Sequence, residues 1–213
     1  MFVRRNLVRE AEVKDKYDIV YADPAWPYFG DPNKDQAAGK HYNLMTLDEI
    51  KALPIREIIH SKSVLLLWTT SSHLADAVEV MPAWGFHFRG VFQVWGKTRK
   101  DGNLIHGQGV RPSFTKPTAE YLLVGSAQKR GRPLPVLTEA MANVVEHEDL
   151  PLEAIASTVV AHPRPTLHSQ KPDVFRDNIV ALFGDRPRIE LFARKRYLGW
   201  SAWGNELPEQ EGG

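Results

Sequence analysis

The chain has 213 residues, 43% of them hydrophobic and 25% charged, and a formal net charge of +1, which is typical of a globular protein. This length fits one domain with a full core, and no apolar run reaches the roughly 18 residues of a membrane-spanning helix. Cysteine is absent, which excludes a disulfide framework, a thiolate metal site and a cysteine nucleophile. The N-terminus is too charged for a signal peptide, so we expect a cytoplasmic protein.

The first informative stretch is YDIVYADPAWPY, at 17–28, which follows a charged lead-in at 1–16. Its first six residues have the β-branched and aromatic content of a buried strand. Pro24 lacks an N–H and keeps Asp23 out of the helical region, so the strand is predicted to end in an extended turn. Ligands of open α/β sheets bind outside the carboxyl ends of strands. A carboxylate beside Trp26 at such an end suits a planar ring that carries an amine.

A stretch rich in glycine, aspartate and proline follows at 29–40, and its position favours a gate beside the predicted site. Thr46 and Glu49 have the spacing of a capping box, which predicts a helix ending near Pro54. A second short helical segment is predicted at 55–60.

The rest of the chain alternates between strand and helix patterns, which indicates an α/β fold with a mostly parallel sheet. The predicted elements are strand 63–69, helix 73–81 (capped by Ser71 or Ser72, broken by Pro82 and ended by Gly85), strands 86–95, 120–125 and 158–161, helix 172–183 (ended by Gly184) and strand 188–193.

Asp23-Pro24-Ala25-Trp26 resembles the D-P-P-[YFW] motif of S-adenosylmethionine-dependent amino methyltransferases, with Ala25 in place of the second proline. The whole chain resembles the MT-A70 family, the bacterial, phage and eukaryotic relatives of the catalytic subunit of the mRNA adenosine N6-methyltransferase. Further family-like segments follow in the family's order, namely HYNLMTLDEI, LLLWTT, VFQVWGKT, EYLLVG, HSQKPD, IELFAR and GWSAWGNE. The resemblance implies a Rossmann-like methyltransferase fold, a mostly parallel twisted sheet flanked by helices, with the catalytic motif before the cofactor motif.

The resemblance also implies roles for the catalytic turn. Asp23 and the Pro24 carbonyl are expected to accept hydrogen bonds from the adenine N6 amine, and Trp26 is expected to stack on the base. Tyr28 and Tyr42 are expected to contribute to the substrate pocket. These residues together predict methyl transfer to the exocyclic N6 amine of adenine in nucleic acid.

S-adenosylmethionine is the cofactor that the resemblance implies. Lys171 in HSQKPD resembles the lysine that holds the methionine carboxylate, and Arg194 and Asn205 resemble cofactor-binding residues. We add Asp23, Glu190 and Glu206 to the predicted cofactor residues. Glu190 lies in an apolar strand and needs a partner, for which Arg194 or polar groups of the cofactor are candidates.

Three basic stretches are predicted to flank the site and to contact phosphates, although the net charge is low for a nucleic-acid-binding protein. They are 97–100, 111–116 and 129–132, from which Lys97, Arg111 and Lys116 are the predicted substrate contacts. The histidines are too scattered for metal-ligand spacing, and we predict no metal.

One methyltransferase domain is expected over 1–213, with an insertion at 128–156 and a flexible tail at 207–213. DNA is the favoured substrate, because a small family member without RNA-binding appendages resembles the phage and bacterial versions. RNA, methylation of a cytosine or glutamine amine, and a non-catalytic partner subunit that binds nucleic acid are the alternatives. A homodimer or heterodimer is left open, and no membrane partner is expected.

Overall fold

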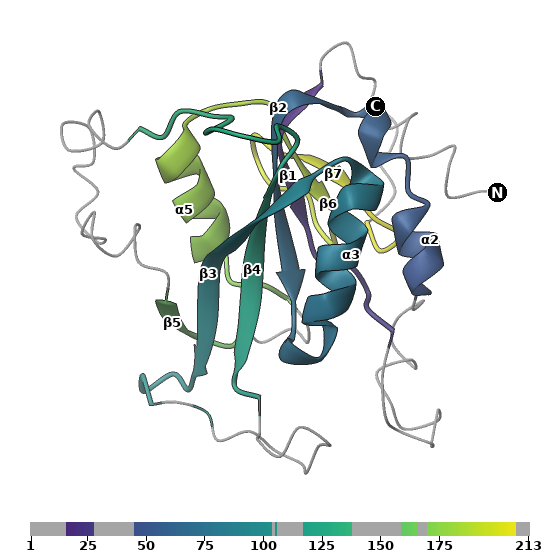
Figure 1. Cartoon of the computed structure of the whole chain (residues 1–213). Helices are drawn as coiled ribbons and strands as arrows, with labels where there is room; N and C mark the ends of the chain where they lie inside the picture. The colour runs from purple at the N-terminus through teal and green to yellow at the C-terminus, as the bar shows by residue number, and fades with distance from the viewer. Residues whose placement is uncertain are drawn as a thin grey trace, which may run out of the picture.

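The computed structural model describes residues 16–27, 45–103, 105, 117–137, 159–165 and 170–207. These residues form one seven-stranded sheet in the order β5-β3-β4-β2-β1-β6-β7, with helices on both faces (Figure 1). The strands are β1 (Tyr17–Ala22), β2 (Ile59–Thr69), β3 (His87–Thr98), β4 (Ala119–Ser126), β5 (Val159–Pro163), β6 (Arg188–Leu191) and β7 (Ser201–Trp203).

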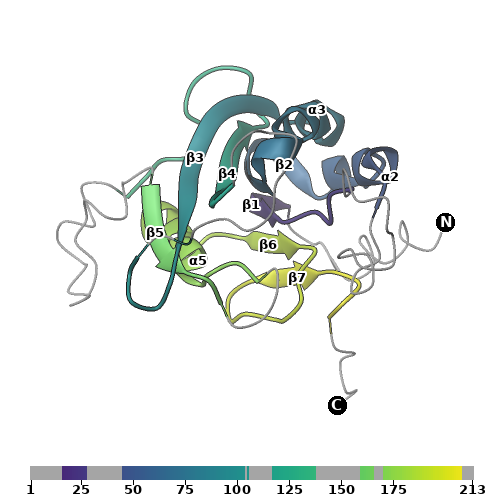
Figure 2. The same cartoon turned by 90° about the horizontal axis from the view of Figure 1, so that it is seen from below.

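The sheet is mostly parallel, as predicted. β1 is parallel to both of its neighbours, β2 and β6, and the pairs β6–β7 and β3–β5 are also parallel. β4 is antiparallel to β2 and to β3, so it alone among the described strands runs in the opposite direction. The start of β4 therefore lies at the same edge as the carboxyl ends of the other strands, which we call the carboxyl edge. Figure 2 views the molecule from this side.

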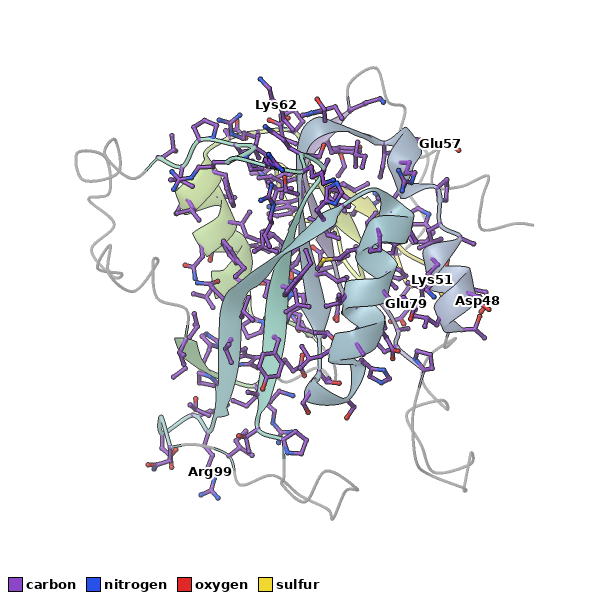
Figure 3. The ribbon with its side chains drawn as sticks, in the orientation of Figure 1. Asp48, Lys51, Glu57, Lys62, Glu79 and Arg99 are labelled. Atoms are coloured by element: carbon purple, nitrogen blue, oxygen red, sulfur yellow. The ribbon has the colours of Figure 1, made fainter. Side chains whose placement is uncertain are left out.

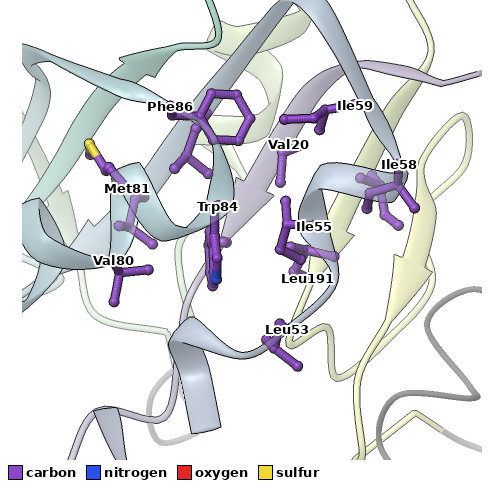
Figure 4. Packing of buried hydrophobic residues seen from close by; sticks show 14 of the residues in the cluster. Val20, Leu53, Ile55, Ile58, Ile59, Val80, Met81, Trp84, Phe86 and Leu191 are labelled. Carbon is purple, nitrogen blue, oxygen red and sulfur yellow. The ribbon is translucent and has the colours of Figure 1, made fainter. Parts of the chain in front are cut away.

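One face of the sheet is covered by α2 (Leu47–Lys51), the 3-10 turn η2 (Ile55–Glu57) and α3 (Leu74–Trp84). Trp84 is fully buried in this layer, and its indole N–H donates to the Ile50 carbonyl at 2.8 Å, which joins α3 to α2. Val20 and Leu191 meet the same cluster from the sheet (Figure 4). The other face packs against α5 (Val174–Phe183) through Phe175.

Several predicted elements need correction. α3 begins after the 3-10 turn η3 (Ser71–His73), and neither serine makes a cap hydrogen bond to it. Pro82 does not break α3 but lies in its last turn, where Arg56 donates to the Pro82 and Ala83 carbonyls and so satisfies the helix end. The segment predicted as helical at 55–60 is a single 3-10 turn followed by the start of β2.

The capping box of α2 is present, with Thr46 and Glu49 bonded to each other's backbone N–H groups. The predicted strand at 158–161 is confirmed as β5, and Gly85 and Gly184 end α3 and α5 as expected.

The basic turn at 129–132 is not beside the predicted site. It follows the end of β4, about 20 Å from Glu120 at the rise of an extended strand. The two ends of the sheet are marked in Figure 3 by Lys62 at one and Arg99 at the other. The prediction that all three basic stretches flank one site is therefore wrong for this one, because the direction of β4 could not be read from its sequence.

Candidate active site

The turn formed by residues 23–26 leaves the interior of the sheet at its carboxyl edge. Asp23 directly follows Ala22, the last residue of β1, which pairs with Leu67 of β2 and Leu191 of β6. The turn is closed by the Trp26 N–H, which donates to the Pro24 carbonyl at 2.9 Å. The Ala25 carbonyl accepts from the backbone N–H of residue 45 at 3.4 Å, so the chain returns to this turn after residues 28–44.

Four side chains of alternating charge meet at the carboxyl edge and form what we call the charge chain. The Lys171 ammonium donates to an Asp23 carboxylate oxygen at 2.5 Å and lies 3.3 Å from a Glu120 oxygen. The other Glu120 oxygen accepts from Lys97 at 2.5 Å. These residues come from the end of β1, the segment before α5, the start of β4 and the end of β3. The fold thus brings together groups up to 148 residues apart in sequence.

The electrostatics of the charge chain favour a protonated lysine between two carboxylates. Burial raises the pKa of Asp23 above its ordinary value, with Glu120 adding to the rise and Lys171 opposing it. Burial also acts to raise the pKa of Glu120, but Lys171 and Lys97 outweigh it and the net pKa is lowered. Lys171 is buried, which disfavours its charge, yet the two carboxylates raise its pKa. A carboxylate with a raised pKa is the better proton acceptor, which distinguishes Asp23 from Glu120.

The Trp26 side chain is fixed in position beside the charge chain. Its indole N–H donates to the Trp68 carbonyl at the end of β2 at 3.0 Å. Its ring is stacked on the His73 imidazole, with centroids 5.8 Å apart and planes inclined by 13°. An aromatic ring fixed next to a partly buried carboxylate can bind a planar heterocycle by stacking while the carboxylate accepts from its amine.

The C-terminal segment builds a second group of polar residues at the carboxyl ends of β6 and β7. The Arg194 guanidinium lies 3.4 Å from the Glu206 carboxylate. The positive charge of Arg194 also slightly opposes the rise that burial causes in the pKa of Asp23, which puts the two regions within electrostatic reach. Phe192 has a φ of 61°, a left-handed conformation that is uncommon for a non-glycine residue and redirects the chain directly after β6. A Cβ atom at Gly204 would collide with the Ala193 backbone, so only glycine allows this approach.

Comparison with known proteins supports this architecture. The MT-A70 family model matches residues 17–206, from the first residue of β1 to beyond β7. The chain belongs to the MT-A70 family. Its match to the motif segments in order therefore reflects membership and not chance similarity.

Three relatives show how far the MT-A70 similarity extends. The Type II methyltransferase M.MunI of Mycoplasma sp is 27% identical over 217 residues, 93% of this chain and 81% of that protein. The N(6)-adenine-specific methyltransferase METTL4 of Homo sapiens is 29% identical, over 90% of this chain and 37% of that protein. The N6-methyladenosine RNA methyltransferase MTA1 of Pyricularia oryzae is 23% identical, over 90% and 47%. The chain thus spans most of the mycoplasma protein but under half of the other two.

Glu190 is paired differently from expectation. Both of its carboxylate oxygens accept from Arg176 of α5, at 2.5 and 2.7 Å, whereas Arg194 pairs with Glu206. Glu190 pairs with Tyr21 in the sheet register and its side chain is buried toward α5. Its assignment to the cofactor site stays a prediction, with a structural partner now accounting for its burial.

The remaining predicted residues divide into two groups. Lys97 belongs to the charge chain, and Asn205 and Glu206 lie exposed in the turn after β7. Four predicted substrate residues lie outside the described residues: Tyr28, Tyr42, Arg111 and Lys116. The N-terminal lead-in, most of the predicted insertion and most of the tail also lie outside them.

Sequence reasoning missed Glu120, His73 and Arg176. Glu120 had a usable signal, because a glutamate directly before an apolar strand run must face either solvent or a cation. His73 had no such signal, since its stacking on Trp26 depends on how β1 and β2 are aligned.

Two further features concern metals and membranes. In the part of the chain that the structure describes, no three or more histidine, aspartate or glutamate side chains gather in a way that could hold a metal ion. None of the described helices has the length and apolar character needed to cross a membrane.

Proposed function

We propose that this MT-A70 chain transfers a methyl group from S-adenosylmethionine to the exocyclic N6 amine of adenine in nucleic acid, with DNA as the favoured substrate. The observation that carries the proposal is the placement of Asp23 and Trp26 directly after the carboxyl end of β1, an inner strand of the sheet, with Asp23 bonded to Lys171 of the charge chain. The names of the human and fungal relatives, which specify N6-adenine and N6-methyladenosine, support adenine N6 as the target.

The adenine amine is a poor nucleophile, because its lone pair is delocalised into the ring. Hydrogen-bond acceptors on both N–H groups turn the lone pair toward an electrophile. Asp23 supplies one acceptor, and the Pro24 carbonyl supplies the other, since a carbonyl with one lone pair used by the Trp26 N–H has a second one available. Trp26 holds the plane of the ring, by stacking worth about 1–3 kcal/mol per base.

The proton that leaves the amine after methylation needs an acceptor. Asp23 is suited to this role because its pKa is raised by burial and by the nearby Glu120. Lys171 stays protonated between the two carboxylates and fixes the orientation of the Asp23 carboxylate. Holding the two substrates in line is then the main contribution of the site, worth about 7–11 kcal/mol in well-oriented reactions.

S-adenosylmethionine supplies an electrophilic methyl group on a positively charged sulfur when it is bound. The donor set at the ends of β6 and β7 fits such a ligand, because Arg194, Asn205 and Glu206 offer both donors and acceptors for a ribose. Gly204 lets the chain after β7 lie directly against the Ala193 backbone, which brings Asn205 and Glu206 to this end of the sheet. Lys171, the cation bonded to Asp23, would bind the methionine carboxylate. Glu190 stays a proposed cofactor residue, and its pair with Arg176 also gives it a structural role.

Nucleic acid is proposed to bind over the carboxyl edge. The chain enters residues 106–116 from the end of β3 and leaves them at the start of β4. Both points lie at the carboxyl edge, because the Lys97 N–H donates to the Thr118 carbonyl at 3.0 Å. Arg99 and Lys100 are exposed at the same edge. The target adenine must leave its stack to reach Asp23, at a cost of a few kcal/mol. DNA stays the favoured substrate in this proposal because the chain is similar over 93% of its length to a bacterial Type II methyltransferase.

The test is methyl transfer from labelled S-adenosylmethionine to unmethylated duplex DNA, single-stranded DNA and RNA, followed by nucleoside analysis. We expect N6-methyladenine from the wild type, most on DNA, and none from Asp23→Asn. Asp18→Asn, at the opposite end of β1, is the matched control and should retain activity. Product on another base, or cofactor binding without any transfer by the wild type, would contradict the proposal and indicate a different substrate or a partner subunit.

A further inference from the structure

A histidine outside the family's motif segments lies directly against the predicted base-stacking tryptophan. The His73 ring lies nearly parallel to the Trp26 ring, at a centroid distance of 5.8 Å and an inclination of 13°, which is an offset stacked pair and not an edge contact. The edge of the same indole is fixed by its bond to the Trp68 carbonyl. Two contacts, one on the face and one on the edge, therefore determine the plane of Trp26.

His73 is itself held in place from α3. Its Nδ1 atom lies 2.8 Å from a carboxylate oxygen of Asp76, and its backbone N–H donates to the Thr70 carbonyl at 3.1 Å. The His73 side chain is only 9% exposed. A ring that is buried and bonded in this way cannot easily move aside for a ligand.

We propose that His73, held by Asp76, is a positioning residue for base recognition: it supports one face of Trp26 so that the target adenine stacks on the opposite face. This inference rests on the proposed function and adds a residue to it. The ring order would be adenine, Trp26, His73, and the last two are already parallel in the described structure. A preorganised plate lowers the entropy that is lost when the base stacks.

The contrary reading is that His73 occupies the place of the adenine and is displaced by it. The two readings predict opposite effects of removing the imidazole. Loss of a support weakens binding of the nucleic acid, whereas loss of a competitor strengthens it. The burial of His73 and its bond to Asp76 favour the support.

The experiment measures KM and kcat for methyl transfer to unmethylated duplex DNA by the wild type and by His73→Leu, His73→Phe and Asp76→Asn. His73→Leu is expected to raise KM about three- to ten-fold, the range that an aromatic pair of this kind can account for, with kcat little changed. His73→Phe restores a flat ring and should recover at least half of the loss. His60→Leu is the matched control, since His60 also pairs with an aspartate, Asp18 at 2.6 Å, but on β1 and β2 at the other end of the sheet.

A double variant separates support of Trp26 from a general effect on folding. If His73 acts through Trp26, His73→Leu should add nothing to the KM of Trp26→Leu. Additive effects, an unchanged KM or a lowered KM in His73→Leu would overturn the inference. Thermal unfolding of each variant shows whether the fold is retained. A wild type without transfer would instead refute the proposed function, so the two failures are distinct.

Discussion

The Arg176–Glu190 pair gives the sharpest prediction about stability, because it decides whether Glu190 is a structural or a cofactor residue. The Arg176 guanidinium donates two hydrogen bonds to the Glu190 carboxylate, and the side chains are 7% and 9% exposed. Arg176 also lies over the rings of Tyr21 and Tyr197, at 5.4 and 3.9 Å. Arg176→Met keeps the apolar stem but removes the charge, so a buried carboxylate is left without its partner.

Breaking a buried pair from one side costs about 3–5 kcal/mol. For a chain of this size, that loss corresponds to a fall in Tm of about 6–20 °C. Replacing both members at once, as in Arg176→Met/Glu190→Leu, removes the unpaired charge, and we expect it to recover most of the lost stability. The Lys51–Glu79 pair is the control, because its side chains are 23% and 60% exposed and Lys51→Met should cost less than about 1 kcal/mol.

Denaturant unfolding gives the free energies, and calorimetry of S-adenosylmethionine binding to the folded variants gives the second measurement. If Glu190 serves only Arg176, the double variant binds the cofactor within a few-fold of the wild type. If Arg176→Met lowers the free energy of unfolding by less than about 1 kcal/mol, the buried-pair argument is refuted. A stable double variant that no longer binds the cofactor would instead return Glu190 to the cofactor site.

Three other predictions concern the carboxyl edge. Asp23 has to be ionised to accept from the amine, so activity should fall as the pH drops through its raised pKa. Glu120 is one of the groups that raise this pKa. In Glu120→Gln the acid limb of the pH–rate profile should therefore move to lower pH. Gly204→Ala places a methyl group against backbone and should lower the free energy of unfolding by about 1–3 kcal/mol in denaturant titrations, with weaker cofactor binding by calorimetry. Arg99→Gln should reduce the salt slope of DNA affinity by about 1, whereas Arg130→Gln at the opposite edge should not; equal slopes would contradict the placement of the DNA.

Local patterns predicted the elements well where one physical rule decides the outcome. The capping box at Thr46 and Glu49 and the left-handed glycine after α3 are local features, and both are present. Pro82 misled because its effect depends on its position in the helix. It lies in the last turn of α3, where the Pro82 and Ala83 carbonyls have no later turn to bond, and Arg56 of another element donates to both.

The candidate site was predictable only in part, for a related reason. Asp23 and Trp26 were found because their motif is contiguous, and Lys171 because its segment resembles the family's. The pairing of Lys171 with both Asp23 and Glu120 depends on three segments that only the folded sheet brings together. The sequence left Arg194 and polar groups of the cofactor as candidate partners of Glu190. In the folded sheet its side chain instead pairs with Arg176 of α5.

The direction of β4 explains both the most important omission and the clearest error. Active residues in parallel sheets are sought after strand ends, and Glu120 lies near a strand start. Because β4 is antiparallel to β2 and β3, its start joins the carboxyl edge and places Glu120 beside Lys171. The same reversal carries the basic turn at 129–132 to the far end of the sheet. The antiparallel direction of β4 thus places the Glu120 carboxylate at the site and the basic turn at 129–132 away from it. Neither position can be predicted until the order and directions of the strands are known.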